Sequence, residues 1–214
     1  DPCARLLECV MSTESVVTTL DLLRHGACEG GEIFRGSTDV ALSAEGWEQM
    51  HAAIADLTGW EAIVSSPMRR CRRFAAQLAE RVARPHRIME DLREIHFGEW
   101  EGNTTASVLA EQGDLLRLYW DAPLAVTPPG GEPVADFRER VLPCLDALLE
   151  DYRGQHLLVV SHGAVVRMMI CQLLDLPLTS FSRFSVPYAA MTRFQIHESA
   201  GRPRPWVQLC WHRA

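Results

Sequence analysis

Two histidines of this sequence follow segments that look like buried strands. Residues 18–23 and 157–160 are short, largely apolar runs with the composition of strands in an α/β sheet. Arg24-His25-Gly26 follows the first run and Ser161-His162-Gly163 the second. In parallel sheets, ligands bind at the carboxyl ends of the strands, so both side chains are candidates for chemistry. The remaining histidines lack this placement, and we expect no catalytic role for them: His51, His86, His96, His156, His197 and His212.

Two arginines near these histidines indicate that the bound group is a phosphoryl group. Arg24 directly precedes His25, and Arg70 falls in the first turn of a helix expected to start at Ser66-Pro67. A guanidinium group binds phosphate oxygens in bidentate fashion, and the amides at a helix N-terminus bind the same anion. Other arginines of that helix are expected on a solvated face: Arg69, Arg72 and Arg73.

The segment 92–102 offers carboxylates for proton transfer. It is rich in glycine and aromatic residues, is expected to be a loop, and contains Glu94, Glu99 and Glu101. One of these carboxylates could act as a general acid, whereas most glutamates in such a loop are surface residues. The loop pattern alone leaves the choice among them open.

The rest of the chain alternates between strand and helix patterns. Further strands are expected at 62–65 and 87–89, with a closing hairpin of 191–196 and 206–211; helices are expected at 43–57, 66–82, around 105–119, from Pro133 onward, and from 163 to about 174. This order predicts a three-layer α/β/α sandwich with a mostly parallel central sheet. We expect one domain of residues 16–214, preceded by a poorly ordered extension of residues 1–15.

The charge composition excludes several classes of protein. The net charge is −7, which disfavours partners such as nucleic acids and anionic membranes, so an anionic substrate must be bound by a local positive pocket. Every basic side chain is arginine, because the sequence contains no lysine. A Gly-Lys-Ser/Thr phosphate loop and a Schiff-base lysine are therefore impossible.

The cysteine pattern and the N-terminal residues predict where in the cell the protein is found. Seven widely spaced cysteines without a Cys-x-x-Cys pair favour reduced thiols in a cytoplasm over a disulfide scaffold or a zinc site: Cys3, Cys9, Cys28, Cys71, Cys144, Cys171 and Cys210. No apolar run is long enough to span a bilayer. Residues 1–10 lack the pattern of a signal peptide, and Met11 could be the natural start.

An ordered set of motifs resembles the histidine phosphatase superfamily, which includes the phosphoglycerate mutases. The set comprises Arg24-His25-Gly26 and the segments 35–46, 65–70, 92–94, 97–102, 129–132 and 160–163. It covers the chain from Leu20 to about Leu176. The first motif is weak alone, whereas the ordered set is highly specific.

The resemblance implies a role for each candidate residue. His25 would attack phosphorus and become phosphohistidine, while Arg24, Arg70 and His162 would hold the phosphoryl oxygens. Glu94 would protonate the leaving alkoxide and then activate water. No cofactor or metal is implied, and the expected partner is a small phosphorylated metabolite, with a homodimer left open.

Within the superfamily, the segment 20–42 most resembles the alpha-ribazole phosphatases, which act in cobalamin biosynthesis. This resemblance implies removal of the 5′-phosphate of alpha-ribazole phosphate. The alternative is a phosphoglycerate mutase-like enzyme or a broad-specificity sugar or nucleotide phosphatase. Candidates for binding the substrate, in addition to the phosphoryl-binding residues, are Arg35, Ser37, Gly163 and the segment 103–128. Two positions depart from the usual pattern: Gly31 replaces a common asparagine, and Pro133 replaces a serine after Gly-Gly-Glu.

Four other functions compete with this interpretation of the residues. A cysteine phosphatase needs an arginine six residues after the cysteine, but Phe34 and Gln77 stand six residues after Cys28 and Cys71. A site of two histidines and a carboxylate could bind Fe(II) or Zn(II), although neighbouring arginines disfavour a cation. A non-catalytic phospholigand binder remains open. A cofactor-dependent mutase is disfavoured because the chain lacks room for the added cap segment of those relatives.

Overall fold

The computed structural model describes residues 15–200 and 203–214, which contain a six-stranded sheet in the order β3-β2-β4-β1-β5-β6. The strands are β1 (Val16–Arg24), β2 (Ala62–Ser65), β3 (His86–Ile88), β4 (His156–Ser161), β5 (Met191–Glu198) and β6 (Trp206–Arg213). Strands β3, β2, β4 and β1 pair in parallel, and the β5–β6 hairpin adds antiparallel to β1. The mostly parallel sheet and the closing hairpin are therefore confirmed.

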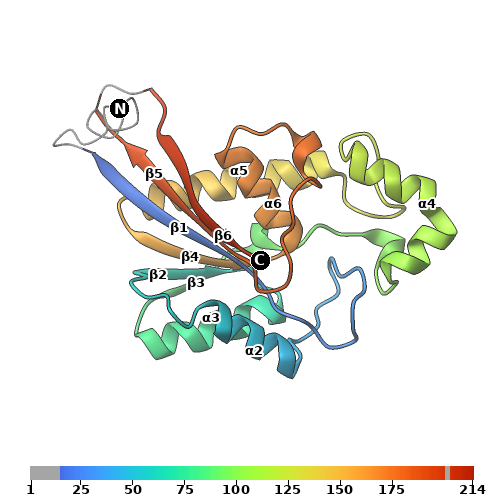
Figure 1. Ribbon diagram of the computed structural model, residues 1–214, viewed down its shortest axis with the longest axis horizontal. Helices are drawn as coiled ribbons and strands as arrows, with labels where there is room; N and C mark the ends of the chain where they lie inside the picture. Colours follow the sequence, from blue (N-terminus) through green and yellow to red (C-terminus); the bar gives the residue numbers. More distant parts are fainter. Residues whose placement is uncertain (1–14, 201–202) are drawn as a thin grey trace.

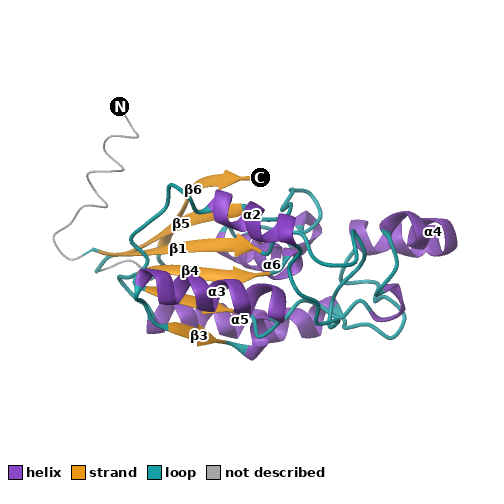
Figure 2. Ribbon diagram, turned by 90° about the horizontal axis from the view of Figure 1, so that it is seen from below, coloured by secondary structure: helices purple, strands orange, loops and turns teal. Residues whose placement is uncertain are grey.

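Helices cover both faces of this sheet. Helices α2 (Ala44–Ala53) and α3 (Arg69–Val82) lie on one face, and α5 (Val134–Asp151) and α6 (Gly163–Leu173) lie on the other (Figure 1). Helix α4 (Thr105–Asp121) lies beyond the carboxyl ends of the parallel strands, away from the sheet (Figure 2). Short 3-10 helices occur at Glu90–Leu92, Gly98–Trp100 and Leu178–Ser180. The predicted three-layer α/β/α sandwich is confirmed.

The central strands are largely apolar because both of their faces are covered. Along β1, Leu20 and Leu22 enter the core under α5 and α6, whereas Leu23 enters the core under α2 and α3. Along β4, Leu157 and Leu158 divide between the two cores in the same way. Strands buried on both faces are expected to lack the alternation of polar and apolar residues.

Helix α3 starts later than expected. The prediction of a start at Ser66-Pro67 is wrong, because Met68 is extended and the helix begins at Arg69. The Ser66 hydroxyl contacts the ring of His162 at 2.7 Å, and Asp39, from a distant loop, accepts the Arg69 amide at 2.7 Å. Arg70 nevertheless lies in the first turn, as predicted, and Arg69, Arg72 and Arg73 are exposed, as predicted.

The other differences are small. Helix α2 has the predicted Ser43 cap but ends at Ala53, because Ile54 leaves helical geometry. Strand β3 lies one residue earlier than expected. The expected extension of residues 1–15 lies, apart from Ser15, outside the described residues. No helix in the described part of the chain is long and apolar enough to cross a membrane.

A buried carboxylate joins β1 to its neighbours. Asp21 is 0% exposed and accepts two hydrogen bonds of 2.7 Å from Arg193. The ring nitrogens of Trp60 and His156 lie 2.7 and 2.9 Å from the same carboxylate. Burial alone would raise the pKa of Asp21, but these hydrogen bonds together bring it below its ordinary value. The network therefore favours an ionised Asp21 inside the fold.

We expect Asp21→Asn to lower the free energy of unfolding by about 3 kcal/mol, because it leaves Arg193 without its carboxylate. Urea unfolding at pH 7 measures this loss. The matched control is Asp151→Asn, which breaks the exposed pair with Arg87 and should cost less than about 1 kcal/mol. Equal losses of unfolding free energy in the two variants would show that the buried Asp21 network stabilises the fold no more than an exposed ion pair does.

The same variant gives a pH test. A carboxyl whose pKa is lowered by folding stabilises the protein above its unfolded pKa, and this stabilisation is lost as the pH falls through the folded value. The difference in unfolding free energy between wild type and Asp21→Asn should therefore shrink in acid.

Candidate active site

His25 lies at the first position after β1 and has one ring nitrogen fixed. Its Nδ1 lies 2.8 Å from the carbonyl oxygen of Gly26. A carbonyl can only accept, so Nδ1 carries the proton and Nε2 holds a lone pair. A Cβ at Gly26 would collide with the carbonyl of Gly46 in α2, so glycine is required there for the helix to pack against this turn.

The surroundings of His25 keep its ring neutral. Its side chain is buried, and burial lowers the pKa of His25 well below its ordinary value, with the charges of Arg70, Arg24 and Arg35 adding to the effect. A neutral imidazole with a free Nε2 is the form that can act as a nucleophile.

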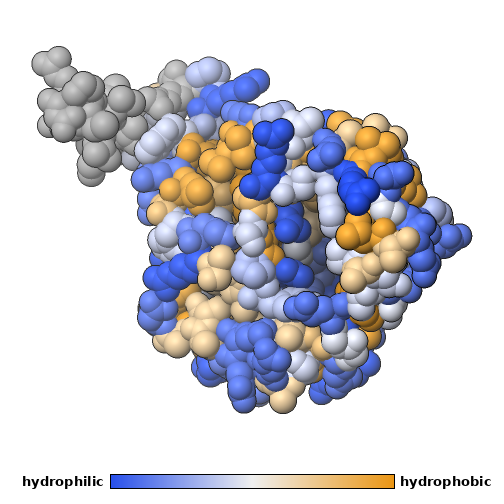
Figure 3. All heavy atoms as spheres, turned by 45° about the vertical axis from the view of Figure 1, so that its right-hand side comes forward, coloured by the Kyte–Doolittle hydropathy of each residue, from blue (hydrophilic) through white to orange (hydrophobic). Residues whose placement is uncertain are grey.

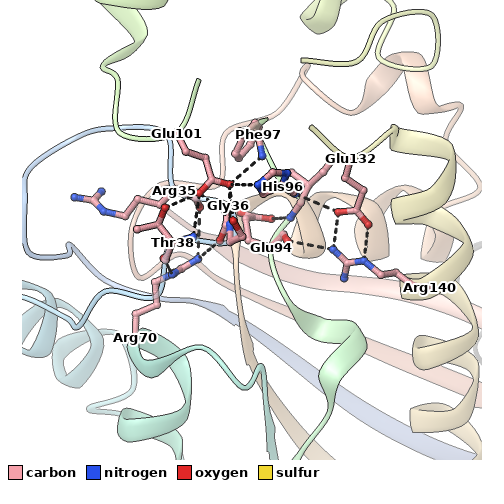
Figure 4. A network of polar contacts seen from close by, with 12 residues as sticks. Arg35, Gly36, Thr38, Arg70, Glu94, His96, Phe97, Glu101, Glu132 and Arg140 are labelled. Atoms are coloured by element: carbon pink, nitrogen blue, oxygen red, sulfur yellow. Dashed lines mark hydrogen bonds and ion pairs between the residues drawn. The ribbon is translucent and has the colours of Figure 1, made fainter. Parts of the chain in front are cut away.

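Arg70 is held in the site by backbone carbonyls. It is 0% exposed, its Nη1 donates to Thr38 O at 2.8 Å, and its Nη2 donates to Gly36 O at 3.0 Å. Its Nε donates to Nδ1 of His162 at 3.2 Å. Figure 4 shows how the 35–38 loop wraps around this guanidinium group. Since these acceptors are uncharged, Arg70 keeps a full positive charge available to an anion.

His162 follows β4, as His25 follows β1. Because Nδ1 of His162 accepts from Arg70, its proton lies on Nε2, which is 2.7 Å from the Ser66 hydroxyl. The two histidine rings are 5.2 Å apart, which confirms that the two strand ends bring them together. Both nitrogens of His162 are engaged by the protein, so a contact with a phosphoryl oxygen requires the release of one of these bonds and stays a prediction.

Arg24 also has a free donor beside His25. Its Nη1 donates to Val186 O at 2.6 Å, and its guanidinium carbon lies 4.3 Å from the centre of the Tyr188 ring. Its Nε is buried and has no partner in the described residues. Burial lowers the pKa of Arg24. An unpaired, buried donor of this kind is expected to bind a ligand.

Arg35 is the third arginine of the site, and it is buried. Its Nη2 donates to the carbonyl oxygens of Glu29 and Gly31, so Gly31, at the position where relatives often have asparagine, contributes its backbone. The Nε of Arg35 is buried without a partner among the described residues. Ser37, in contrast, is exposed, and both its amide and its hydroxyl bind Glu101. Ligand contacts of Arg35 and Ser37 stay predictions.

Glu94 is the buried carboxylate of the 92–102 loop. Its Oε2 accepts from the Ala164 amide at the start of α6 at 3.2 Å, and its Oε1 accepts from the Ile95 amide at 3.1 Å. Burial raises the pKa of Glu94, although these amides, Arg70 and Arg24 oppose the shift. Glu99 is exposed, so Glu94 is the carboxylate placed to keep a proton and transfer it.

An ion pair that the sequence analysis missed holds the Glu94 loop. Arg140 of α5 forms bonds of 2.7 and 2.9 Å with Glu132 and also donates to the carbonyls of Asp91, Arg93 and Glu94. Figure 4 shows the ion pair of Arg140 and Glu132 beside Glu94. The Pro-Gly-Gly-Glu motif already marked Glu132 in the sequence. Only the fold shows that its partner is Arg140.

Glu101, named above only as a candidate acid, has a structural role that the sequence did not predict. It receives the amides of Ser37, Thr38 and Phe97 at 2.8 to 3.2 Å. The hydrogen bonds lower the pKa of Glu101 although burial opposes them. This carboxylate therefore joins the 35–38 loop, which holds Arg70, to the loop that carries Glu94.

Helix α4 lies beyond the strand ends that carry the candidate site (Figure 2). The face that carries α4 is hollowed, and hydrophilic residues surround the hollow (Figure 3). Within the described residues, no group of three or more His, Cys, Asp or Glu side chains could hold a metal ion. The described cysteines are free thiols: Cys28, Cys71, Cys144, Cys171 and Cys210. Cys28 lies 3.5 Å from Nδ1 of His25.

Several curated proteins are similar in sequence. A bifunctional protein of Mycobacterium tuberculosis is 38% identical over 163 residues, which are 74% of this chain and 44% of that protein. This chain therefore spans less than half the length of that relative. Glucosyl-3-phosphoglycerate phosphatase of Mycolicibacterium vanbaalenii is 33% identical over 77% of this chain and 78% of that protein. A 2,3-bisphosphoglycerate-dependent phosphoglycerate mutase of Rhizobium etli is 31% identical over 84% of this chain and 91% of its own.

Solved structures share the fold. A mycobacterial glucosyl-3-phosphoglycerate phosphatase matches with a TM-score of 0.78 and 28% identity, covering 91% of this chain and 97% of that one. The alpha-ribazole phosphatase of Shigella flexneri matches with a TM-score of 0.70 and 23% identity over 89% and 95% of the two chains, which shows the fold alone. The family model of the histidine phosphatase superfamily (branch 1) matches residues 20–208. The chain therefore belongs to the histidine phosphatase superfamily.

Proposed function

We propose that this phosphatase hydrolyses phosphomonoesters of small metabolites in two steps through a phosphohistidine at His25. The observation that carries the proposal is the fixed tautomer of His25, which leaves a lone pair on Nε2. Burial and the charges of Arg70, Arg24 and Arg35 lower the pKa of this ring and keep it neutral. No resident metal or cofactor is part of this mechanism.

In the first step, Nε2 of His25 forms a bond to phosphorus while the bond from phosphorus to the ester oxygen breaks. Glu94 gives its proton to that oxygen, which leaves as an alcohol. The charges of Arg24 and Arg70 stabilise the negative charge on the phosphoryl oxygens in the transition state. His162 positions Arg70 through the bond between Nδ1 and Nε.

In the second step, the Glu94 carboxylate takes a proton from water, and the water oxygen attacks phosphorus. The bond from phosphorus to Nε2 breaks, phosphate leaves, and His25 returns to its neutral form with the proton on Nδ1. The raised pKa of Glu94 suits both duties, since it must hold a proton in one step and accept one in the next.

Two substrates are candidates. Alpha-ribazole 5′-phosphate is supported by the local resemblance of residues 20–42 and implies a place in cobalamin biosynthesis. A phosphorylated glycerate is supported by relatives of 31 to 33% identity whose names include phosphoglycerate. A cytoplasmic location is proposed from the free thiols in the described residues.

Phosphate release in EDTA tests the proposal. The substrates are alpha-ribazole 5′-phosphate, 3-phosphoglycerate and a generic aryl phosphate. We expect release without added metal, with the ribazole ester preferred. Equal, slow release from all three would remove the ribazole assignment, and release only after a divalent metal is added would contradict the mechanism.

Glu94→Gln should lower kcat/KM for an alkyl phosphate by about 10²–10⁴-fold, because the poor leaving group needs the proton. The first step with an aryl phosphate, whose phenolate leaves without a proton, should slow much less. Single-turnover rates measure both effects. The matched control is Glu99→Gln, an exposed glutamate of the same loop, which should change neither rate. Equal slowing for the two esters in Glu94→Gln would exclude Glu94 as the acid.

A further inference from the structure

An arginine near Glu94 has no part in the proposed mechanism. Arg167 lies on α6, one turn after the Ala164 amide that binds Glu94. It is partly buried, and its Nε contacts only the carbonyl of Phe184, at 3.5 Å. It has no carboxylate within ion-pair distance among the described residues. A guanidinium group has five N–H donors, so most donors of Arg167 are available to a ligand.

Arg167 lies beside another unpaired arginine. A Cβ at Gly163 would be 3.4 Å from Nε of Arg24 and 3.5 Å from Nη1 of Arg167. The two guanidinium groups therefore lie against the same glycine. Burial lowers the pKa of Arg167, and the charge of Arg24 lowers it further. Two adjacent cations without a counter-ion favour a ligand with acceptor oxygens.

A buried hydroxyl without a partner lies in the same region. Tyr119 of α4 is 4% exposed, and its Oη has no hydrogen-bond partner in the described residues. The Tyr119 ring packs against Phe97 and Trp100 of the loop that carries Glu94, with ring centres 6.4 and 5.4 Å apart. Burial raises the pKa of Tyr119, so its hydroxyl keeps its proton. An unsatisfied buried hydroxyl costs about 1–3 kcal/mol, and a ligand oxygen would remove this cost.

The position of Glu94 identifies the part of the substrate that these groups face. Glu94 gives its proton to the ester oxygen, so the leaving group extends on the Glu94 side of the phosphoryl group. A phosphoryl dianion balances the charges of Arg24 and Arg70. The charges of Arg35 and Arg167 are left over, and Arg167 is the one on α6, the helix whose Ala164 amide binds Glu94.

We infer that Arg167 and Tyr119 form a subsite that binds oxygen substituents on the leaving group, close to the ester oxygen. This inference rests on the proposed function. The subsite would bind a ligand oxygen that accepts a hydrogen bond from the Arg167 guanidinium group and another from the Tyr119 hydroxyl. Its source is either a sugar hydroxyl or a carboxylate, and the experiment has one arm for each.

Two matched pairs of esters test the subsite. Ribose 5-phosphate against n-pentyl phosphate is the sugar arm, and 3-phosphoglycerate against n-propyl phosphate is the carboxylate arm. The readout is the ratio of kcat/KM within each pair, in wild type and in Arg167→Gln. Because the difference in alcohol basicity is the same in every variant, it cancels when the ratios are compared.

Arg167→Gln should lower the ratio about tenfold or more in one arm, which identifies the source of the oxygen. Arg81→Gln, which removes an exposed arginine of α3, should leave both ratios unchanged. Tyr119→Phe removes a single oxygen and is a second test of the subsite, which stays informative even if Arg167→Gln fails to fold. It should lower the same ratio and raise Tm, since the empty site leaves the hydroxyl unpaired.

Unchanged ratios in both Arg167→Gln and Tyr119→Phe, with normal phosphate release, would overturn the subsite alone. Absence of release from all four esters by the wild-type protein would overturn the proposed function and the subsite with it.

Discussion

The parallel pairing of β1 with β4 is the constraint on which the candidate site depends. Arg24 lies opposite Ser161 in this pairing, so the next residue of each strand is a histidine. The amide of His25 donates to the carbonyl of Ser161 at 2.9 Å and continues the ladder into the site. A shift of one residue would turn every side chain of β1 to the other face of the sheet. The apolar cores on both faces of the sheet determine the register of β1 against β4. This register places the rings of His25 and His162 5.2 Å apart.

Positive charge without counter-ions is the second organising feature. Arg35 and Arg70 are held by backbone carbonyls, and Arg24 is held by a carbonyl and an aromatic ring. Carbonyls fix a guanidinium group without neutralising it, so the charge stays available for the phosphoryl group. Burial keeps His25 neutral, as a nucleophile must be, and the same charges add to this effect. Glu94, buried beside them, keeps a raised pKa because desolvation outweighs their attraction.

Sequence patterns predicted the parts of the site that depend on local structure. The strands before His25 and His162, the arginine in the first turn of α3 and the carboxylate-rich loop all follow from composition and spacing. The choice of Glu94 came from the family resemblance, and burial now distinguishes it physically from Glu99. The partners that cross the fold were not predictable in this way. Asp39 caps α3 from a loop 30 residues earlier, and Arg140 reaches the Glu94 loop from α5. Such contacts depend on the tertiary structure, which local patterns of the sequence do not predict.

The most direct test of the central claim is the identity of the residue that carries phosphate during turnover. Glu94→Gln with a ³²P-labelled aryl phosphate should accumulate the intermediate, because the first step proceeds while the activation of water is lost. After an alkaline quench, which preserves phosphohistidine, peptide mapping should place close to one phosphate per chain on His25, and His25→Ala should carry none. Label on His162 or Cys28, or turnover by the wild-type protein without a labelled residue, would contradict the account.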